Sequence, residues 1–410
     1  MKFLFCSLIS ATAILASYNN VLAVESDVAL YQYRSEENVE KKKEFFPSGE
    51  AMPENTIEHN SSCNAQNKKN KNENCHIKND KYPQAYNRAA RINPNPDSGW
   101  SFDAYASYIY WNVSQDQMDI AYEVQACTAT RNVSYQDFTY HSGFKVGLGF
   151  GSNFDDWTVD AVYTRLHFTD TNSMGAPPPG NCPPGTAGGT SSQWLVCYPY
   201  MSLIGGQVTY AFDDEWKVGY DNVDLLLGRP FYSGTKLVLL PTFGLRGLWV
   251  QQTFDVSGTN TVGQAFFSEN TSKTWNVGPV ANLNSHWNIW KGFRFEGGLG
   301  ASLLYTRLQK YENNQFLNNP ATATTTGNTR KIVVQQLQSM TPTFDMGLGL
   351  GWGCYAFKHK VYFDLAARYD LTVIHNQNFR PAVNLIFVDN QLPAGDLRLH
   401  GLTLDFTVGF

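Results

Sequence analysis

The sequence predicts an all-β protein, a transmembrane antiparallel β-barrel of about 12–16 strands with short periplasmic turns and long external loops, preceded by a largely unstructured N-terminal extension. Three observations carry this prediction: an apolar segment at the N-terminus, apolar and polar residues that alternate in the C-terminal part, and turns of very unequal length. Aromatic residues make up 14% of the chain, a bias typical of the aromatic girdles at the two membrane interfaces of such barrels.

Residues 1–23 are typical of a secretory signal peptide. Lys2 precedes a mostly apolar run from Phe3 to Ala16, and the segment closes on the small-residue pattern Val21 to Ala23. The run is too short for a membrane helix, and no later stretch reaches the ~18 uninterrupted apolar residues that such a helix needs. We therefore expect export through a cleaved signal peptide to the outer membrane of a Gram-negative cell.

Residues 24–98 differ in composition from the rest of the chain. They are rich in Lys, Glu and Asn, as in the runs from Glu36 to Lys43 and from Asn67 to Asn74. Too little apolar surface is available there to offset the entropy lost when a separate domain orders. The composition favours a flexible extension over a folded functional module.

Residues 99–410 have the pattern of strands joined by turns, with alternation beginning at Trp100 to Trp111. Short turns are expected at 151–153 and at 213–215, the latter joining strands Met201 to Phe212 and Trp216 to Leu227. Long polar connections are expected at 169–198, 257–274 and 312–329, and this asymmetry is typical of outer-membrane barrels. Further strands are predicted at 236–250, 275–287, 293–307, 331–350, 360–373, 382–388 and 397–410.

The last nine residues place Leu402, Leu404, Phe406, Val408 and Phe410 on one face of a strand. A soluble sheet packed on a core shows the same alternation, so this pattern alone leaves that alternative open. Combined with the signal peptide, it favours a membrane wall. We expect Phe410 to be a lipid-facing terminal aromatic that the barrel assembly machinery recognises.

Charged residues lie on the strand face opposite the main apolar run, where they would line a pore. A charged side chain at mid-bilayer costs roughly 2–4 kcal/mol, so this face should point inward. The predicted pore-lining residues are Arg246, Arg294, Glu296, Asp364, Arg368 and Asp370. Mixed signs favour a general aqueous passage over a strongly selective one. The alternative is that these charges pair and fill a solid interior. Arg307 shares the apolar face, and we interpret it as a residue that extends its charge to the interface.

The cysteines suggest two disulfides in an exported protein. Cys63 and Cys75 bracket a polar segment, and Cys182 and Cys197 bracket a loop rich in Pro and Gly. Cys127 and Cys354 could pair with each other, pair with other chains or stay free, and spacing does not fix connectivity. We expect no metal, because no CxxC or HExxH spacing occurs.

No sequence motif indicates an enzyme. The eight His are scattered, His141–Ser142 is only an adjacent pair, and neither a GxSxG elbow nor a GxxxxGK[ST] phosphate loop is present. The net charge of −5 includes no basic block that could bind nucleic acid. We therefore expect no catalytic residues, no cofactor and no nucleic-acid partner.

Several segments resemble the Legionella-type major outer membrane protein family, pore-forming barrels also found in chlamydia-related bacteria. The similarity rests on Trp100 to Val113, Phe144 to Phe168 and, most specifically, Asp224 to Trp249 with its GRPF turn and FGLRG segment. It covers roughly residues 99–410. The resemblance implies an outer-membrane porin that allows passive diffusion of small hydrophilic solutes and ions. It implies no catalytic residues in this chain.

The alternative function is a surface adhesin or a cysteine-cross-linked structural envelope protein whose barrel serves as an anchor. In either case the expected partners are outer-membrane lipid and the assembly machinery, with small hydrophilic solutes added for a porin. No sequence pattern decides whether the protein contacts a host-cell surface or whether it forms a homo-oligomer.

Overall fold

The computed structural model describes residues 100–124, 132–152, 156–177, 193–196, 201, 206–233, 236–318, 328–357, 360–379 and 395–410. The chain divides into two compact units, Met1–Ile77 and Lys78–Phe410, and every described residue belongs to the second. The predicted signal peptide (1–23) and N-terminal extension (24–98) lie outside the described residues. Within the described ranges, no helix has the length and hydropathy that a membrane crossing requires.

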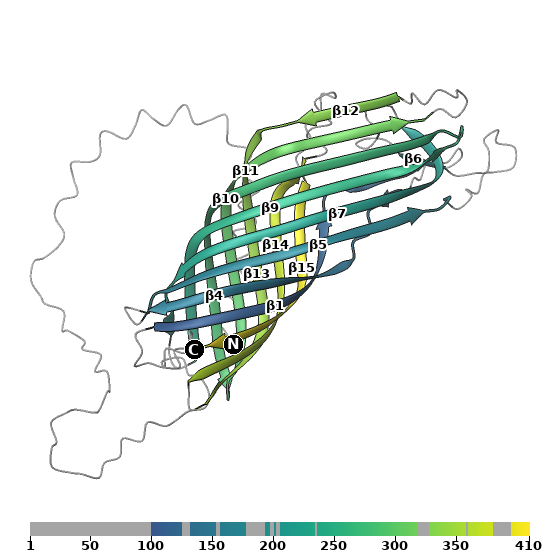
Figure 1. The fold of residues 1–410 in the computed structure, drawn as a ribbon. Coiled ribbons are helices and arrows are strands. Elements are labelled where there is room, and N and C mark those ends of the chain that lie inside the picture. The colour runs from purple at the N-terminus through teal and green to yellow at the C-terminus, as the bar shows by residue number, and fades with distance from the viewer. Residues whose placement is uncertain are drawn as a thin grey trace, which may run out of the picture. The chain divides into compact units, whose positions relative to one another are not determined.

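Ten antiparallel strands form a closed barrel (Figure 1). They follow one another in the order β7-β5-β4-β1-β15-β14-β13-β11-β10-β9, and pairing of β9 with β7 closes the sheet. The fold class predicted from the sequence is confirmed. The barrel strands are β1 (Trp100–Gln115), β4 (Tyr140–Ser152), β5 (Thr158–Met174), β7 (Gln207–Gly228), β9 (Leu237–Asn260), β10 (Ala265–Trp290), β11 (Phe293–Leu317), β13 (Leu337–Ala356), β14 (Val361–Asn378) and β15 (Gly395–Gly409).

Five short strands extend the sheet outside the barrel path. β2 pairs with β3 and β6, and β6 pairs in turn with β7. β12 pairs with β11, and β8 pairs with β9. Their bounds are β2 (Asp119–Val124), β3 (Val133–Tyr135), β6 (Gln193–Val196), β8 (Phe231–Ser233) and β12 (Asn328–Val334).

The expected count of about 12–16 barrel strands was wrong, because individual strands are longer and fewer than the sequence pattern suggests. The turn expected at Asp213 to Glu215 does not exist: β7 runs through these residues, which pair in register with β9. The polar connection expected at 257–274 is instead the paired ends of β9 and β10. Where a strand leaves the bilayer, both of its faces can be polar, so it loses the alternation that identifies it in the sequence.

The two ends of the barrel differ in their connections, as predicted. At one end β10 and β11 are joined by Lys291 and Gly292, whose φ angles of 47° and 85° suit the tight hairpin turns that require positive φ. At the other end longer segments connect β5 to β7, β11 to β13 and β14 to β15, with a short β9–β10 turn as an exception. We call these the short-turn end and the long-loop end, and we place the long-loop end outside the cell because outer-membrane barrels have that polarity.

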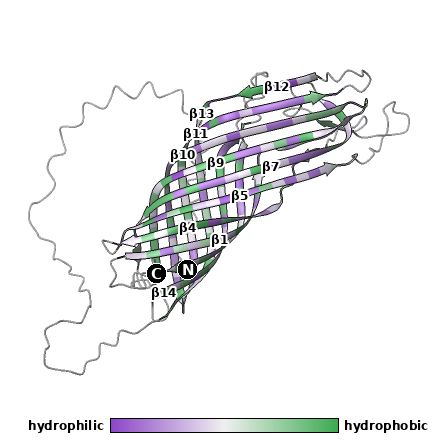
Figure 2. Cartoon of the chain, viewed as in Figure 1, coloured by the Kyte–Doolittle hydropathy of each residue, from purple (hydrophilic) through white to green (hydrophobic). Residues whose placement is uncertain are grey.

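The outer wall of the barrel is apolar and carries aromatic residues toward both ends. Figure 2 shows hydrophobic and hydrophilic residues alternating along the barrel strands. Trp100, Trp290 and Phe293 are exposed near the short turns, and Trp249 and Tyr369 are exposed further toward the long loops. Bands of this kind place aromatic rings at the two membrane interfaces.

Phe410 lies at the join between the first and last barrel strands. Its backbone N–H donates to the Phe102 carbonyl at 2.8 Å, and the Phe102 N–H donates to the Phe410 carbonyl at 3.2 Å. Its side chain is 59% exposed on the outer wall. The residue therefore closes the hydrogen-bonded seam and presents an aromatic ring to lipid.

Deletion of Phe410 should reduce insertion of the protein into the outer membrane, because the seam loses two backbone hydrogen bonds and the wall loses its terminal aromatic ring. The measurement is the amount of protein in the outer-membrane fraction, with Phe410→Trp as a control that keeps an aromatic residue. Normal levels of the deletion variant would show that Phe410 plays no part in assembly.

Candidate functional site

The barrel interior collects the charged residues of the strands. On β9 the contrast is clear, because Arg246 is 7% exposed while its neighbour Leu245 is 58% exposed. The same alternation holds on β11, where buried Arg294 and Glu296 alternate with exposed Phe293 and Phe295. Since a charge on the lipid side costs roughly 2–4 kcal/mol, the pattern turns the polar faces of these strands into the barrel.

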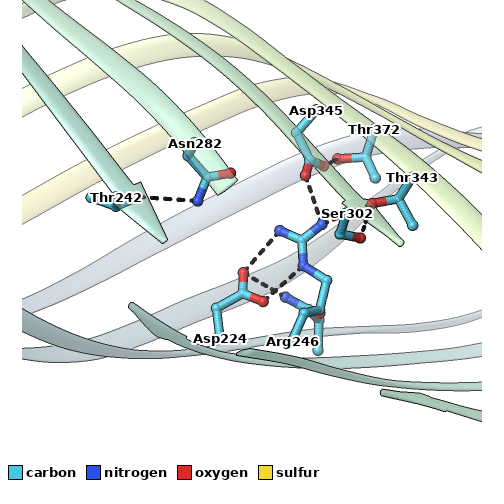
Figure 3. Close-up of polar contacts among 9 residues, drawn as sticks. Asp224, Thr242, Arg246, Asn282, Ser302, Thr343, Asp345 and Thr372 are labelled. Atoms are coloured by element: carbon cyan, nitrogen blue, oxygen red, sulfur yellow. Dashed lines mark hydrogen bonds and ion pairs between the residues drawn. The ribbon is translucent and has the colours of Figure 1, made fainter. Parts of the chain in front are cut away.

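Arg246 of β9 bridges the neighbouring strand β7 and the more distant strand β13, which lies three places away around the barrel (Figure 3). Its Nε and Nη2 donate to the two carboxylate oxygens of Asp224 on β7 at 2.8 and 3.0 Å, and its Nη1 donates to Asp345 on β13 at 2.6 Å. Asp345 also accepts a hydrogen bond from Thr372 of β14 at 2.8 Å. One guanidinium thus links four strands, in the bidentate geometry that makes Arg–carboxylate pairs strong.

A second network lies nearer the short-turn end. Arg294 of β11 donates through Nε to Glu296 at 2.7 Å and through Nη2 to Asp364 of β14 at 2.5 Å. The Tyr362 hydroxyl accepts a longer hydrogen bond from Nη1 at 3.4 Å. The cation is therefore shared between two carboxylates, and neither carboxylate is free to face a passing ion alone.

Asp370 and Arg368 of β14 belong to a third network. Lys145 of β4 pairs with Asp370 at 3.1 Å, and Thr403 of β15 donates to the same carboxylate at 2.7 Å. Arg368 pairs with Asp405 of β15 at 2.9 Å. Charges of both signs therefore alternate around this level of the interior.

A polar cavity of about 270 Å³ lies among these networks. Its lining includes Lys145, Asp224 and Arg246, together with Glu296 and Asp370. Amide and hydroxyl groups of Asn222, Asn282, Asn284 and Thr164 complete much of the surface. A space of this volume with such a lining suits water and small hydrophilic solutes.

A layer of apolar side chains follows the cavity toward the long-loop end. We call it the apolar layer, and it comprises Ile109, Trp111, Leu166, Val218, Tyr220, Leu248, Val250, Ile374, Leu397 and Leu399, all buried in one cluster. Trp111 lies between the two regions: it lines the cavity, donates to Thr403 at 3.1 Å and packs under Lys145, whose Nζ is 4.6 Å from the ring centre. The apolar layer covers β1, β5, β7, β9, β14 and β15, whereas the same level of β10, β11 and β13 carries buried Asn276, Thr306 and Thr341, which are hydrogen-bonded to one another.

The structure brings the six sequence-predicted pore-lining residues to the barrel interior and shows each of them in an ion pair. Sequence reasoning missed four of their partners: Lys145, Asp224, Asp345 and Asp405. Each lies on the inward face of its strand, so alternation could have identified them. The apolar layer was missed as well, since inward apolar residues have the same pattern as lipid-facing ones.

The cysteine predictions fall mostly outside the described residues, which contain none of Cys63, Cys75, Cys127, Cys182 and Cys197. Cys354, on the outward face of β13, forms no disulfide with any described residue. Among the residues that the structure describes, no group of three or more His, Cys, Asp or Glu side chains is arranged to hold a metal ion.

Comparison with solved structures gives outer-membrane barrels at very low similarity. Outer membrane protease OmpT from Escherichia coli is 10% identical, with 78% of this chain and 98% of that chain covered and a TM-score of 0.33. A major outer membrane protein from Thermus thermophilus is 10% identical over 76% of this chain and 99% of that chain, with a TM-score of 0.25. OprG from Pseudomonas aeruginosa is 13% identical over 62% and 94%, with a TM-score of 0.20.

Comparison with curated proteins gives no match. The family model described as Legionella pneumophila major outer membrane protein precursor matches residues 92–410, which is most of the chain and includes every described strand. The match agrees with the resemblance seen in the sequence, and the family together with the barrel fold places the protein in the outer membrane. The chain therefore belongs to the Legionella major outer membrane protein family.

Proposed function

We propose that this protein is a narrow porin, through which small hydrophilic solutes and ions diffuse passively. The observation that carries the proposal is the polar cavity of about 270 Å³ inside a closed barrel. The cavity wall carries hydrogen-bond donors and acceptors and charged groups of both signs. These groups can replace the hydration shell of a small solute without favouring cations or anions. A strongly charged ring of one sign would support a selective channel instead.

The apolar layer sets the size limit of this passage. Hydrophobic constrictions can gate pores by dewetting, because a narrow apolar gap does not hold a continuous column of water. A solute that crosses must displace side chains such as Trp111, Leu248 and Val250. We therefore propose a low rate of passage that falls steeply with solute size, without any catalytic step or cofactor.

A liposome swelling assay tests this function. Purified full-length protein should make vesicles swell in solutions of glycine or a pentose, more slowly in a hexose, and not measurably in a trisaccharide. Folding is checked on the same preparation by far-ultraviolet circular dichroism. Vesicles that contain the folded protein and do not swell in glycine would exclude a porin function.

The rival function is an envelope anchor whose barrel carries the long external loops. The packed apolar layer and the ion-paired charges around the cavity are the observations that favour it, since side chains can fill a narrow barrel completely. If the barrel is an anchor, vesicles should not swell in any of the solutes. If it is a porin, the swelling rate should fall as the solute becomes larger.

The processing and assembly of the chain follow from its export. We propose export through cleavage of residues 1–23, recognition of Phe410 by the barrel assembly machinery, and disulfides within the pairs Cys63–Cys75 and Cys182–Cys197. The sequence context of an exported chain supports all three.

A further inference from the structure

A second cavity, of about 530 Å³, lies on the outer wall over β5, β7, β9 and β10, which run side by side in Figure 1. The strand register defines its central row: His167 pairs with Gly219, Gly219 with Gln251, and Gln251 with Lys273. Gly219 has no side chain, so this row has a gap in its middle. The glycine leaves this position of β7 without a side chain, and the His167 ring lies at contact distance beside it.

The depth of the groove in the membrane follows from its neighbours. One row closer to the short turns, Trp249 pairs with Trp275, and beyond them Val223, Leu225 and Leu245 are exposed apolar residues of the wall. Aromatic rings mark the interface of the bilayer, and the apolar side chains face the acyl chains. The groove therefore lies at the level of the lipid headgroups in the outer leaflet.

Basic side chains surround this groove. Lys217, Lys273 and His167 line it, and Arg307 lies beside Trp275 on β11. Four carboxylates on this face offset part of the charge: Glu215 is 2.9 Å from Lys217, Asp221 is 2.8 Å from His167, and Asp255 and Glu269 act on Lys217 at longer range. Among the described residues, Lys273 and Arg307 have no carboxylate partner within 4.0 Å. Lys273 and Arg307, without a carboxylate partner at headgroup level, can therefore bind an anion.

We propose that this groove binds a phosphate group of the phosphorylated glycolipid of the outer leaflet, with Lys273 and Arg307 as its cationic partners. The sugar lies over Gly219 and Gln251, the phosphate lies beside Lys273, and the acyl chains lie along the apolar wall below Trp249. The arrangement suits a lipid ligand because a headgroup anion and its hydrocarbon are recognised by adjoining surfaces. A free phosphate would gain nothing from that wall.

The test compares two lipids and three variants of the refolded full-length protein. The probes are diphosphoryl lipid A and the same lipid with its phosphates removed, each titrated into protein in neutral detergent. Lys273→Gln with Arg307→Gln should weaken binding of the diphosphoryl lipid about tenfold or more, as expected for loss of charge-assisted hydrogen bonds. Lys360→Gln, an exposed change at the short-turn end, should have no effect.

A second variant, Gly219→Val, fills the groove without changing charge. A Cβ at Gly219 would lie 3.5 Å from the His167 ring, an ordinary contact, and folding of the variant is checked by far-ultraviolet circular dichroism. It should weaken binding of the diphosphoryl lipid as the charge variant does, and inorganic phosphate should compete poorly. Equal affinity for both lipids, or unchanged affinity in both groove variants, would overturn the proposal.

Discussion

Replacement of Arg294 by leucine should lower the free energy of unfolding of the barrel by about 3–5 kcal/mol. Arg294 is buried and is shared by Glu296 and Asp364. Without the guanidinium, two carboxylates stay inside the barrel with no counter-ion, and such a buried charge costs more than the original network. The measurement is reversible urea unfolding of the protein in lipid vesicles.

Two controls separate this effect from the loss of any arginine. Arg398 and Asp116 form an exposed bidentate pair with both distances at 2.8 Å, and Arg398→Leu should cost less than about 1 kcal/mol because water screens the pair. Adding Glu296→Gln and Asp364→Asn to Arg294→Leu should recover part of the lost stability. Equal losses in Arg294→Leu and Arg398→Leu would contradict the buried network.

Opening the apolar layer should raise solute passage several-fold. Leu248→Ser places a hydroxyl in the layer, and Trp111→Ala removes the ring that separates the layer from the polar cavity. Both changes favour a continuous column of water, since wetting of a narrow gap depends on its polarity and width. The measurement is the swelling rate of vesicles in hexose and trisaccharide solutions.

The matched control is Leu245→Ser, the same substitution on the lipid-facing side of β9. It should leave the swelling rate per folded protein unchanged. Each variant is compared at equal folded amount, because truncation of a large buried side chain can cost about 2–5 kcal/mol of stability. If Leu248→Ser and Trp111→Ala pass solutes no faster than the unmodified protein, the apolar layer does not limit passage.

The inward charges were predictable because each stands out against its own strand. Arg294 and Glu296 alternate with exposed phenylalanines, so parity alone assigns them to the interior. Their partners depend on which strands face each other across the barrel. That depends on strand number and register, and the sequence pattern overestimated the number because β7 continues through Asp213 to Glu215.

Alternation could not predict the apolar layer, because inward and outward residues are both apolar there. On β9 the inward face carries Leu248 and Val250, and the outward face carries Leu245 and Trp249, so both faces are apolar and only Arg246 distinguishes them. The groove at Gly219 was equally hidden. A lone glycine and basic residues on four separate strands become neighbours only through the register of β5, β7, β9, β10 and β11.

The most direct test of the porin proposal is the single-channel current of the full-length protein in a planar lipid bilayer. At 1 M KCl, where charges are screened over about 3 Å, the proposal predicts discrete steps of small conductance and weak ion selectivity. The steps should become larger in Trp111→Ala. A folded preparation that gives no current steps, in the unmodified protein and in Trp111→Ala alike, would contradict a pore and leave the barrel as an anchor.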